Sequence, residues 1–118
     1  MVTRQQAVGA HYGLRDWLLQ RLTAIVMAAY TVVLLGVALW YGGIDHALWT
    51  AMFADGAFRI ATFLFMAALA YHAWVGMRNI YMDYVKPVGV RLALQTATVA
   101  VLIAYLGWTI QILWGARA

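Results

Sequence analysis

The sequence predicts an all-α membrane protein with three transmembrane helices. Of its 118 residues, 66% are hydrophobic and only 10% are charged, whereas soluble domains average about 45–50% and about 25%. Three long stretches carry no charged side chain: residues 22–44, 60–77 and 92–116. These stretches are continuously apolar rather than alternating, and only helices or closed barrels satisfy the backbone in lipid, so helices are predicted.

Each stretch is long enough to cross a bilayer, because a hydrocarbon core of about 30 Å needs about 17–25 helical residues. We therefore expect one membrane-anchor domain over residues 1–118, with spans at approximately 18–41, 60–80 and 91–115. The first apolar stretch is longer than the roughly 7–15 residues of a signal-peptide core, and a polar segment precedes it. It is predicted to be a retained first span.

The basic residues predict which way the spans face. Six of the eight lysines and arginines lie in the N-terminal segment and the second loop: Arg4, Arg15, Arg21, Arg78, Lys86 and Arg91. Only Arg59 and Arg117 lie in the first loop and at the C-terminus. By the positive-inside rule, the N-terminus and second loop are expected in the cytoplasm and the C-terminus on the far side.

The first loop has the pattern of a short helix on the membrane surface. Asp45 is predicted to cap its start and Gly56 to end it. Its apolar residues Leu48, Trp49, Met52 and Phe53 are spaced to share one helical face, which suits an interfacial helix. An irregular apolar loop remains the alternative.

Composition also excludes several classes of site. The chain has no cysteine, which rules out disulfides, thiolate nucleophiles and iron–sulfur ligation within it. Its net charge of +4 comes from residues scattered at helix ends, so no nucleic-acid partner is expected. Because three helices enclose little interior, partner helices are expected. Aromatic residues crowd near the span ends and are mostly expected to be interfacial: Trp17, Trp40, Tyr41, Trp74, Tyr81, Tyr84, Trp108 and Trp114.

His72 is the first candidate functional residue, because it interrupts the uncharged run between Arg59 and Arg78. Ionisable residues inside a span are uncommon and frequently functional. Three interpretations remain open for it: a neutral histidine bonded to a neighbouring helix, an axial haem ligand, or a proton relay. Gly76, one turn away, leaves room for a flat macrocycle. His46 and His11 are poorly placed to provide a second ligand, so another subunit would supply it.

Three further polar residues cluster toward the predicted cytoplasmic end. Arg21 opens the first span, either as a snorkelling cation or as a partner for an anion such as a haem propionate. Asp83 follows His72 by 11 residues, which brings it back to within about 20° of the same helical face and about 16 Å away. Tyr84 is a phenolic hydrogen-bond donor. The alternative for this pair is an interfacial tyrosine beside a charge at the helix end.

Several of these residues lie in motifs. His72-Ala-Trp-Val-Gly-Met precedes Asp83-Tyr84-Val-Lys-Pro, and Arg21-Leu-Thr-Ala-Ile-Val opens the first span. Over nearly its whole length, the chain resembles the smaller hydrophobic membrane-anchor subunit, the D subunit, of bacterial succinate dehydrogenase (complex II). An Arg91-Leu92 pair at the start of the third span adds to this resemblance.

The resemblance implies a subunit of succinate:ubiquinone oxidoreductase in the bacterial inner membrane. His72 would be one axial ligand of haem b, with the other ligand coming from a C-type anchor subunit. Arg21 would contact a haem propionate, while Asp83 and Tyr84 would form part of the ubiquinone site. The flavoprotein and iron–sulfur subunits would dock on the cytoplasmic face, and no succinate-oxidising residue would lie in this chain.

Two other functions remain open from the sequence. One is the anchor of a fumarate reductase, which runs the reverse reaction with menaquinone. The other is a membrane adaptor or small transporter subunit without cofactors. Changes at His72 and Tyr84 distinguish this last class, because an adaptor would tolerate both.

Overall fold

The structure, a computed structural model, describes the backbone of residues 2–115 and the side chains of residues 13–115. It contains helices α1 (Val2–Tyr41), α2 (His46–Ala54), α3 (Gly56–Tyr84) and α4 (Val88–Ile110), followed by a π-helical turn, η1 (Gln111–Gly115). No strand occurs in these described residues. The predicted all-α class is confirmed.

Three helices have the length and apolar character to cross a membrane: Gly13–Tyr41, Gly56–Tyr84 and Val88–Gly115. Each contains one predicted span completely, and α1 continues toward the N-terminus far beyond residue 18. The chain is therefore a multi-pass membrane protein. The direction in which it crosses the membrane stays a prediction.

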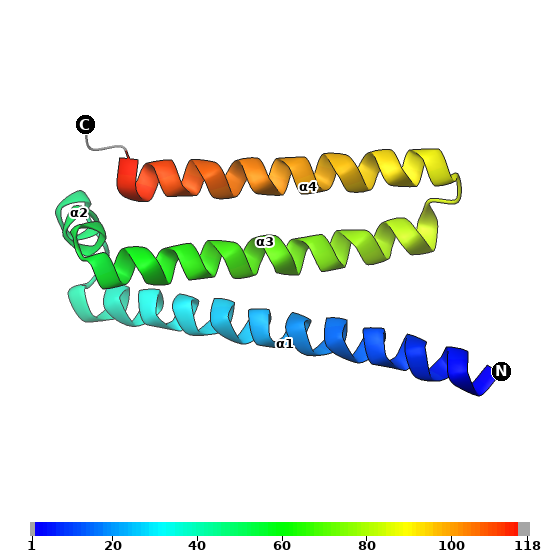
Figure 1. Ribbon diagram of the computed structural model, residues 1–118. Coiled ribbons are helices and arrows are strands. Elements are labelled where there is room, and N and C mark those ends of the chain that lie inside the picture. Colours follow the sequence, from blue (N-terminus) through cyan, green and yellow to red (C-terminus); the bar gives the residue numbers. More distant parts are fainter. Residues whose placement is uncertain (1, 116–118) are drawn as a thin grey trace.

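The long helices lie side by side, with α3 between α1 and α4 (Figure 1). The start of α1 and the α3–α4 connection lie at one end of the molecule, while α2 and the end of α4 lie at the other. Residues 78–86 and the first turns of α1 therefore share an end. The arrangement brings the predicted cytoplasmic residues together.

The turn after α1 requires glycine. Gly42 and Gly43 have φ angles of 71° and 129°, which L-residues with a Cβ rarely adopt. The Gly43 N–H donates to the Ala38 carbonyl at 2.7 Å, the longer bond of a Schellman motif. This turn ends α1 and reverses the chain toward α2.

Helix α2 confirms one capping prediction and contradicts another. The Asp45 carboxylate accepts from the Leu48 N–H at 2.8 Å, so it is the predicted N-cap. Gly56 does not end this helix, because α2 stops at Ala54 and Gly56 is the first residue of α3. Asp55 is the junction instead: its extended backbone donates to Met52 O and accepts from Arg59 N.

Aromatic contacts hold α2 against the start of α3. The Phe53 ring lies 4.7 Å from Trp49 and 4.8 Å from Phe58, measured between centroids, which suits aromatic pairs. The first loop is thus an ordered helix, and the alternative of an irregular loop is wrong. Its predicted place on the membrane surface stays a prediction.

Very little of the chain is buried. Among the described side chains, those classed as buried are Ala68, Val75, Tyr81, Thr109 and Leu113. A soluble protein of this size has a far larger core. Most of the apolar surface must face lipid or other helices.

We predict that Asp45→Ala loosens α2 and speeds hydrogen exchange of the Leu48 amide. Loss of an N-cap costs typically about 1 kcal/mol, which corresponds to roughly fivefold faster exchange if local opening governs it. Asp55→Ala is the matched control, since the Asp55 side chain makes no cap hydrogen bond at the start of α3. Hydrogen-exchange mass spectrometry would contradict the prediction if both variants exchanged at the wild-type rate near residue 48.

Candidate functional site

The imidazole of His72 is held by a threonine on the neighbouring helix. Thr23 Oγ1, on α1, lies 3.1 Å from His72 Nδ1, on α3. The same hydroxyl lies 2.9 Å from the Leu19 carbonyl and 3.0 Å from the Gln20 carbonyl. The structure shows no hydrogen-bond partner for His72 Nε2 among the side chains it describes. One ring nitrogen is therefore engaged, and the other remains available.

Gln20 reinforces this contact between α1 and α3. Its Nε2 donates to the His72 carbonyl at 3.4 Å, which is a long bond, and its buried Oε1 has no described partner. Gly76 lies one turn beyond His72, and a Cβ at this position would meet no described atom within 4 Å. The α3 surface beside His72 is thus open, as expected if a flat group approaches there.

Asp83 and Tyr84 occupy the last turn of α3. The helix runs without interruption from Gly56 to Tyr84, so the predicted 11-residue relation between His72 and Asp83 holds. Both side chains are exposed, and 79% of Tyr84 is accessible. The backbone turns extended at Val85, before Pro87. The phenol and carboxylate therefore stand at the helix end, free to meet a molecule from outside this chain.

An ion pair that the sequence analysis did not identify fastens α1 to α3 near this end. The Arg78 guanidinium donates to the Asp16 carboxylate through a short contact. The side chains are 26% and 36% exposed, so they are partly shielded from solvent. The two residues are 62 positions apart in the sequence, so neither segment by itself predicts that they form a pair. The pair gives Arg78 a structural role in addition to its place in the positive-inside pattern.

Tyr81 also makes a contact that the sequence does not predict. It is 9% exposed, and its hydroxyl lies 2.8 Å from Thr98 Oγ1 on α4. It therefore joins α3 to α4, and its expected place at the membrane interface stays a prediction. Two interhelical contacts therefore lie just before Asp83 and Tyr84 in the sequence: Arg78 binds α1, and Tyr81 binds α4.

Arg21 is not brought to His72 within this chain. It lies two residues before Thr23 on α1, which corresponds to about 3 Å along the axis and a rotation of about 200°. Its side chain is exposed, and the guanidinium carbon sits 4.7 Å from the centre of the Trp17 ring. No described carboxylate pairs with it. It remains available to an anionic group on that face of α1.

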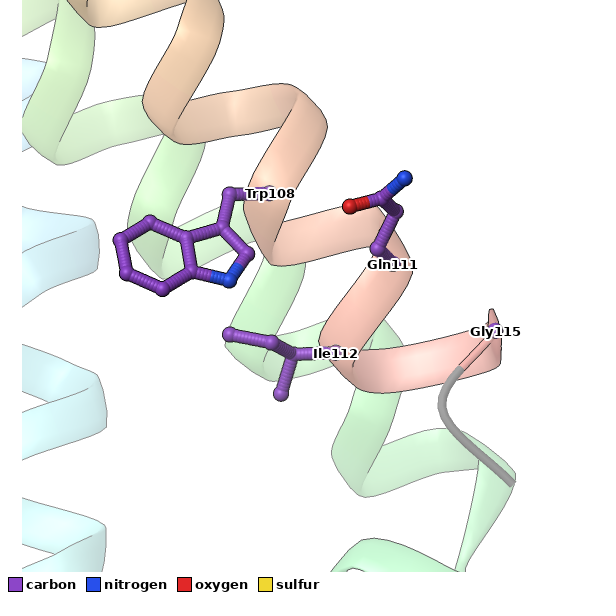
Figure 2. Close-up of a pocket in the computed structure, with 4 residues that line it drawn as sticks. All are labelled: Trp108, Gln111, Ile112 and Gly115. Atoms are coloured by element: carbon purple, nitrogen blue, oxygen red, sulfur yellow. The ribbon is translucent and has the colours of Figure 1, made fainter. Parts of the chain in front are cut away.

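The other histidines and a surface hollow near the end of α4 lie elsewhere. His46 begins α2 at the opposite end of the molecule, and the His11 side chain lies outside the described residues. A hollow of about 420 Å³ near the end of α4 is lined by Trp108, Gln111, Ile112 and Gly115 (Figure 2). It contains none of the predicted site residues. In the described part of the chain, no three histidine, aspartate or glutamate residues cluster as a metal site.

Comparison with known proteins agrees with a membrane-spanning chain. Residues 1–107 match the family described as succinate dehydrogenase/fumarate reductase transmembrane subunit. The chain belongs to this family. It is also 38% identical to the succinate dehydrogenase hydrophobic membrane anchor subunit of Coxiella burnetii over 105 residues, or 89% of this chain and 91% of the relative. The predicted resemblance is confirmed, and the chain is a membrane anchor subunit of this family.

We predict that Asp16 and Arg78 stabilise the α1–α3 contact as a pair. A double-mutant cycle with Asp16→Asn and Arg78→Gln, followed by thermal unfolding of the assembled complex, should give a coupling of about 0.5–1 kcal/mol. This value is modest because both groups are partly exposed. Arg15→Gln is the control, since Arg15 neighbours Asp16 but has no described ion-pair partner. Strictly additive effects of the two changes would contradict the pairing.

Proposed function

We propose that this chain is the D-type anchor of a succinate:ubiquinone oxidoreductase, where it provides one side of a haem b site and part of the ubiquinone site. The observation that carries the proposal is His72: one ring nitrogen is held by Thr23, and the other has no described partner. Haem-ligating histidines have this form, with a second hydrogen bond orienting the ring. Membership of the family supports the same assignment.

The residues around His72 suit a haem. Gly76 leaves the neighbouring surface of α3 open, and a single histidine matches a ligand set completed by a second subunit. Arg21 offers an exposed positive charge at a similar depth for a propionate. When bound, the haem supplies a one-electron redox centre. In this chain, His72 would hold the iron, and Arg21, on a different face of α1 from Thr23, would balance the negative charge of a propionate.

The C-type anchor subunit is proposed as the chain that completes the site. The exposed apolar helices need neighbours, and the small residues Ala24, Ala28 and Gly36 on α1 are all exposed within this chain. Small side chains let helices approach closely. The flavoprotein and iron–sulfur subunits would dock at the end that carries Asp83 and Tyr84, on the cytoplasmic side of the bacterial inner membrane.

At that end, Tyr84 would donate its phenolic hydrogen bond to a carbonyl oxygen of ubiquinone. The hydrogen bond makes this carbonyl easier to reduce, because it stabilises the negative charge that develops on the oxygen. Asp83, the preceding residue, would orient the phenol or pass protons from the cytoplasm. Both side chains are exposed in the single chain, as a site shared with partner subunits requires.

A fumarate reductase anchor is the second candidate, because the family description includes both enzymes. The name of the Coxiella relative favours the succinate-oxidising type. The direction of electron flow depends on redox potentials outside this chain. A cofactor-free adaptor would show no haem and would be indifferent to changes at His72 and Tyr84.

We predict that Tyr84→Phe leaves the complex assembled but lowers quinone reduction about tenfold, as expected for losing a hydrogen bond to developing charge. Succinate oxidation with a water-soluble electron acceptor should stay at the wild-type rate. Tyr41→Phe is the matched control, because it removes the same hydroxyl from an exposed tyrosine at the opposite end. A wild-type rate of quinone reduction in Tyr84→Phe would contradict the proposed role of Tyr84 in the quinone site.

We predict that His72→Ala abolishes or shifts the b-type signal in a reduced-minus-oxidised optical spectrum of the purified complex. The physical reason is loss of an axial nitrogen ligand. His46→Ala is the control, since His46 lies on α2 at the far end. An unchanged spectrum in an assembled His72→Ala complex would refute the ligand assignment.

A further inference from the structure

We propose that Thr23 is a positioning residue that selects the tautomer of His72 and so leaves Nε2 free to ligate the haem iron. The inference rests on the proposed haem role of His72. It is carried by one hydroxyl group, Thr23 Oγ1, which touches three partners from two helices. No role follows for this threonine from the family match alone.

The first step counts protons. A threonine hydroxyl has one proton to donate and two lone pairs. Thr23 Oγ1 lies 2.9 Å from the Leu19 carbonyl and 3.0 Å from the Gln20 carbonyl. Carbonyl oxygens can only accept, so the hydroxyl proton is directed toward them. If the proton pointed at His72 instead, the oxygen lone pairs would face two carbonyl oxygens at hydrogen-bond distance in a poorly solvated place.

The second step follows from the remaining contact. The Thr23 hydroxyl donates its proton to the α1 carbonyls. In the 3.1 Å contact with His72, the donor must therefore be Nδ1–H, and Thr23 Oγ1 accepts. In its neutral form, the imidazole is then the Nδ1–H tautomer, and the lone pair is on Nε2. Nε2 has no described partner. The arrangement leaves Nε2 available to a metal before any metal arrives.

The third step concerns the strength of the ligand. A hydrogen bond donated from Nδ1–H raises the electron density of the imidazole and its basicity as a ligand. Thr23 accepts this hydrogen bond while it donates to α1 carbonyls. The linked hydrogen bonds therefore polarise one another in the same direction. A more basic axial ligand stabilises the oxidised iron over the reduced iron. Thr23 is therefore expected to keep the haem potential lower than it would be without the hydroxyl.

The chain contains a closely matched control for this threonine. Thr31, on the same helix, donates to the carbonyl four residues earlier, Met27, at 2.8 Å. It has no described contact with a histidine. Replacing either threonine with valine keeps the shape and removes the hydroxyl. Only the Thr23 change removes a partner of His72.

The test is a potentiometric titration of the haem, followed optically, in the assembled complex carrying Thr23→Val, Thr23→Ser or Thr31→Val. We expect Thr23→Val to shift the reduced-to-oxidised ratio about tenfold toward the reduced haem at a given potential, which is 59 mV for one electron. Thr23→Ser and Thr31→Val should titrate as wild type. If Thr23→Val instead loses haem, haem retention in Thr23→Ser and Thr31→Val supports the same role.

Two results would overturn the inference. One is a wild-type potential in Thr23→Val with the haem bound, and the other is an equal shift or haem loss in Thr31→Val or Thr23→Ser. Failure of the proposed function is distinguishable: it would appear as a b-type spectrum unchanged by His72→Ala, or as no b-type haem in the wild-type complex. If the haem spectrum depends on His72 but the haem potential does not depend on Thr23, the proposed haem site is supported and only the role of Thr23 is refuted.

Discussion

The structure depends on the need to pair polar groups within an apolar environment. A membrane-spanning helix satisfies its own backbone, but its polar side chains need partners from the same or a neighbouring helix. Three contacts between side chains of α1 and α3 meet this need at different depths: Asp16–Arg78, Thr23–His72 and Tyr30–Thr62, the last at 2.7 Å. On α1, the three positions are seven residues apart. That spacing returns to nearly the same helical face, so one face of α1 carries all three contacts.

These three contacts fix the alignment of the two helices better than apolar packing does. Apolar contacts in lipid discriminate weakly between neighbouring registers, because lipid tails are as apolar as leucine. Sliding α1 by one turn, about 5.4 Å, would break all three polar contacts together. It would leave His72 and Arg78 without partners in a poorly solvated region, where unpaired polar groups are costly. The position of His72 against Thr23 thus follows from the same register that pairs Arg78 with Asp16.

The sequence was sufficient to predict three membrane-spanning helices and the Asp45 cap. These features are local: long uncharged runs and a capping side chain. The functional role of His72 stays a prediction. Thr23 could not be singled out in the same way, because a threonine inside a helix usually bonds its own backbone, as Thr31 does. Which threonine also reaches another helix depends on register, as does the pairing of Arg78 with Asp16. The prediction that Gly56 ends α2 rested on glycine being common after helices, but α2 ends at Ala54, the backbone of Asp55 is extended, and Gly56 is the first residue of α3.

The continuity of α3 links the proposed haem and quinone residues. His72 and Asp83 lie on one uninterrupted helix, so their separation of about 16 Å and their shared face are set by the count of residues between them. The helix has no proline within it, and Arg78 and Tyr81 fasten its last turns to α1 and α4. A rigid helix held in this way keeps two sites in a constant relation even if each is completed by a different partner subunit. In the proposed function, the chain would contribute to electron transfer mainly through geometry: it would hold the proposed haem ligand and the proposed hydrogen-bond donor to quinone at fixed positions along α3.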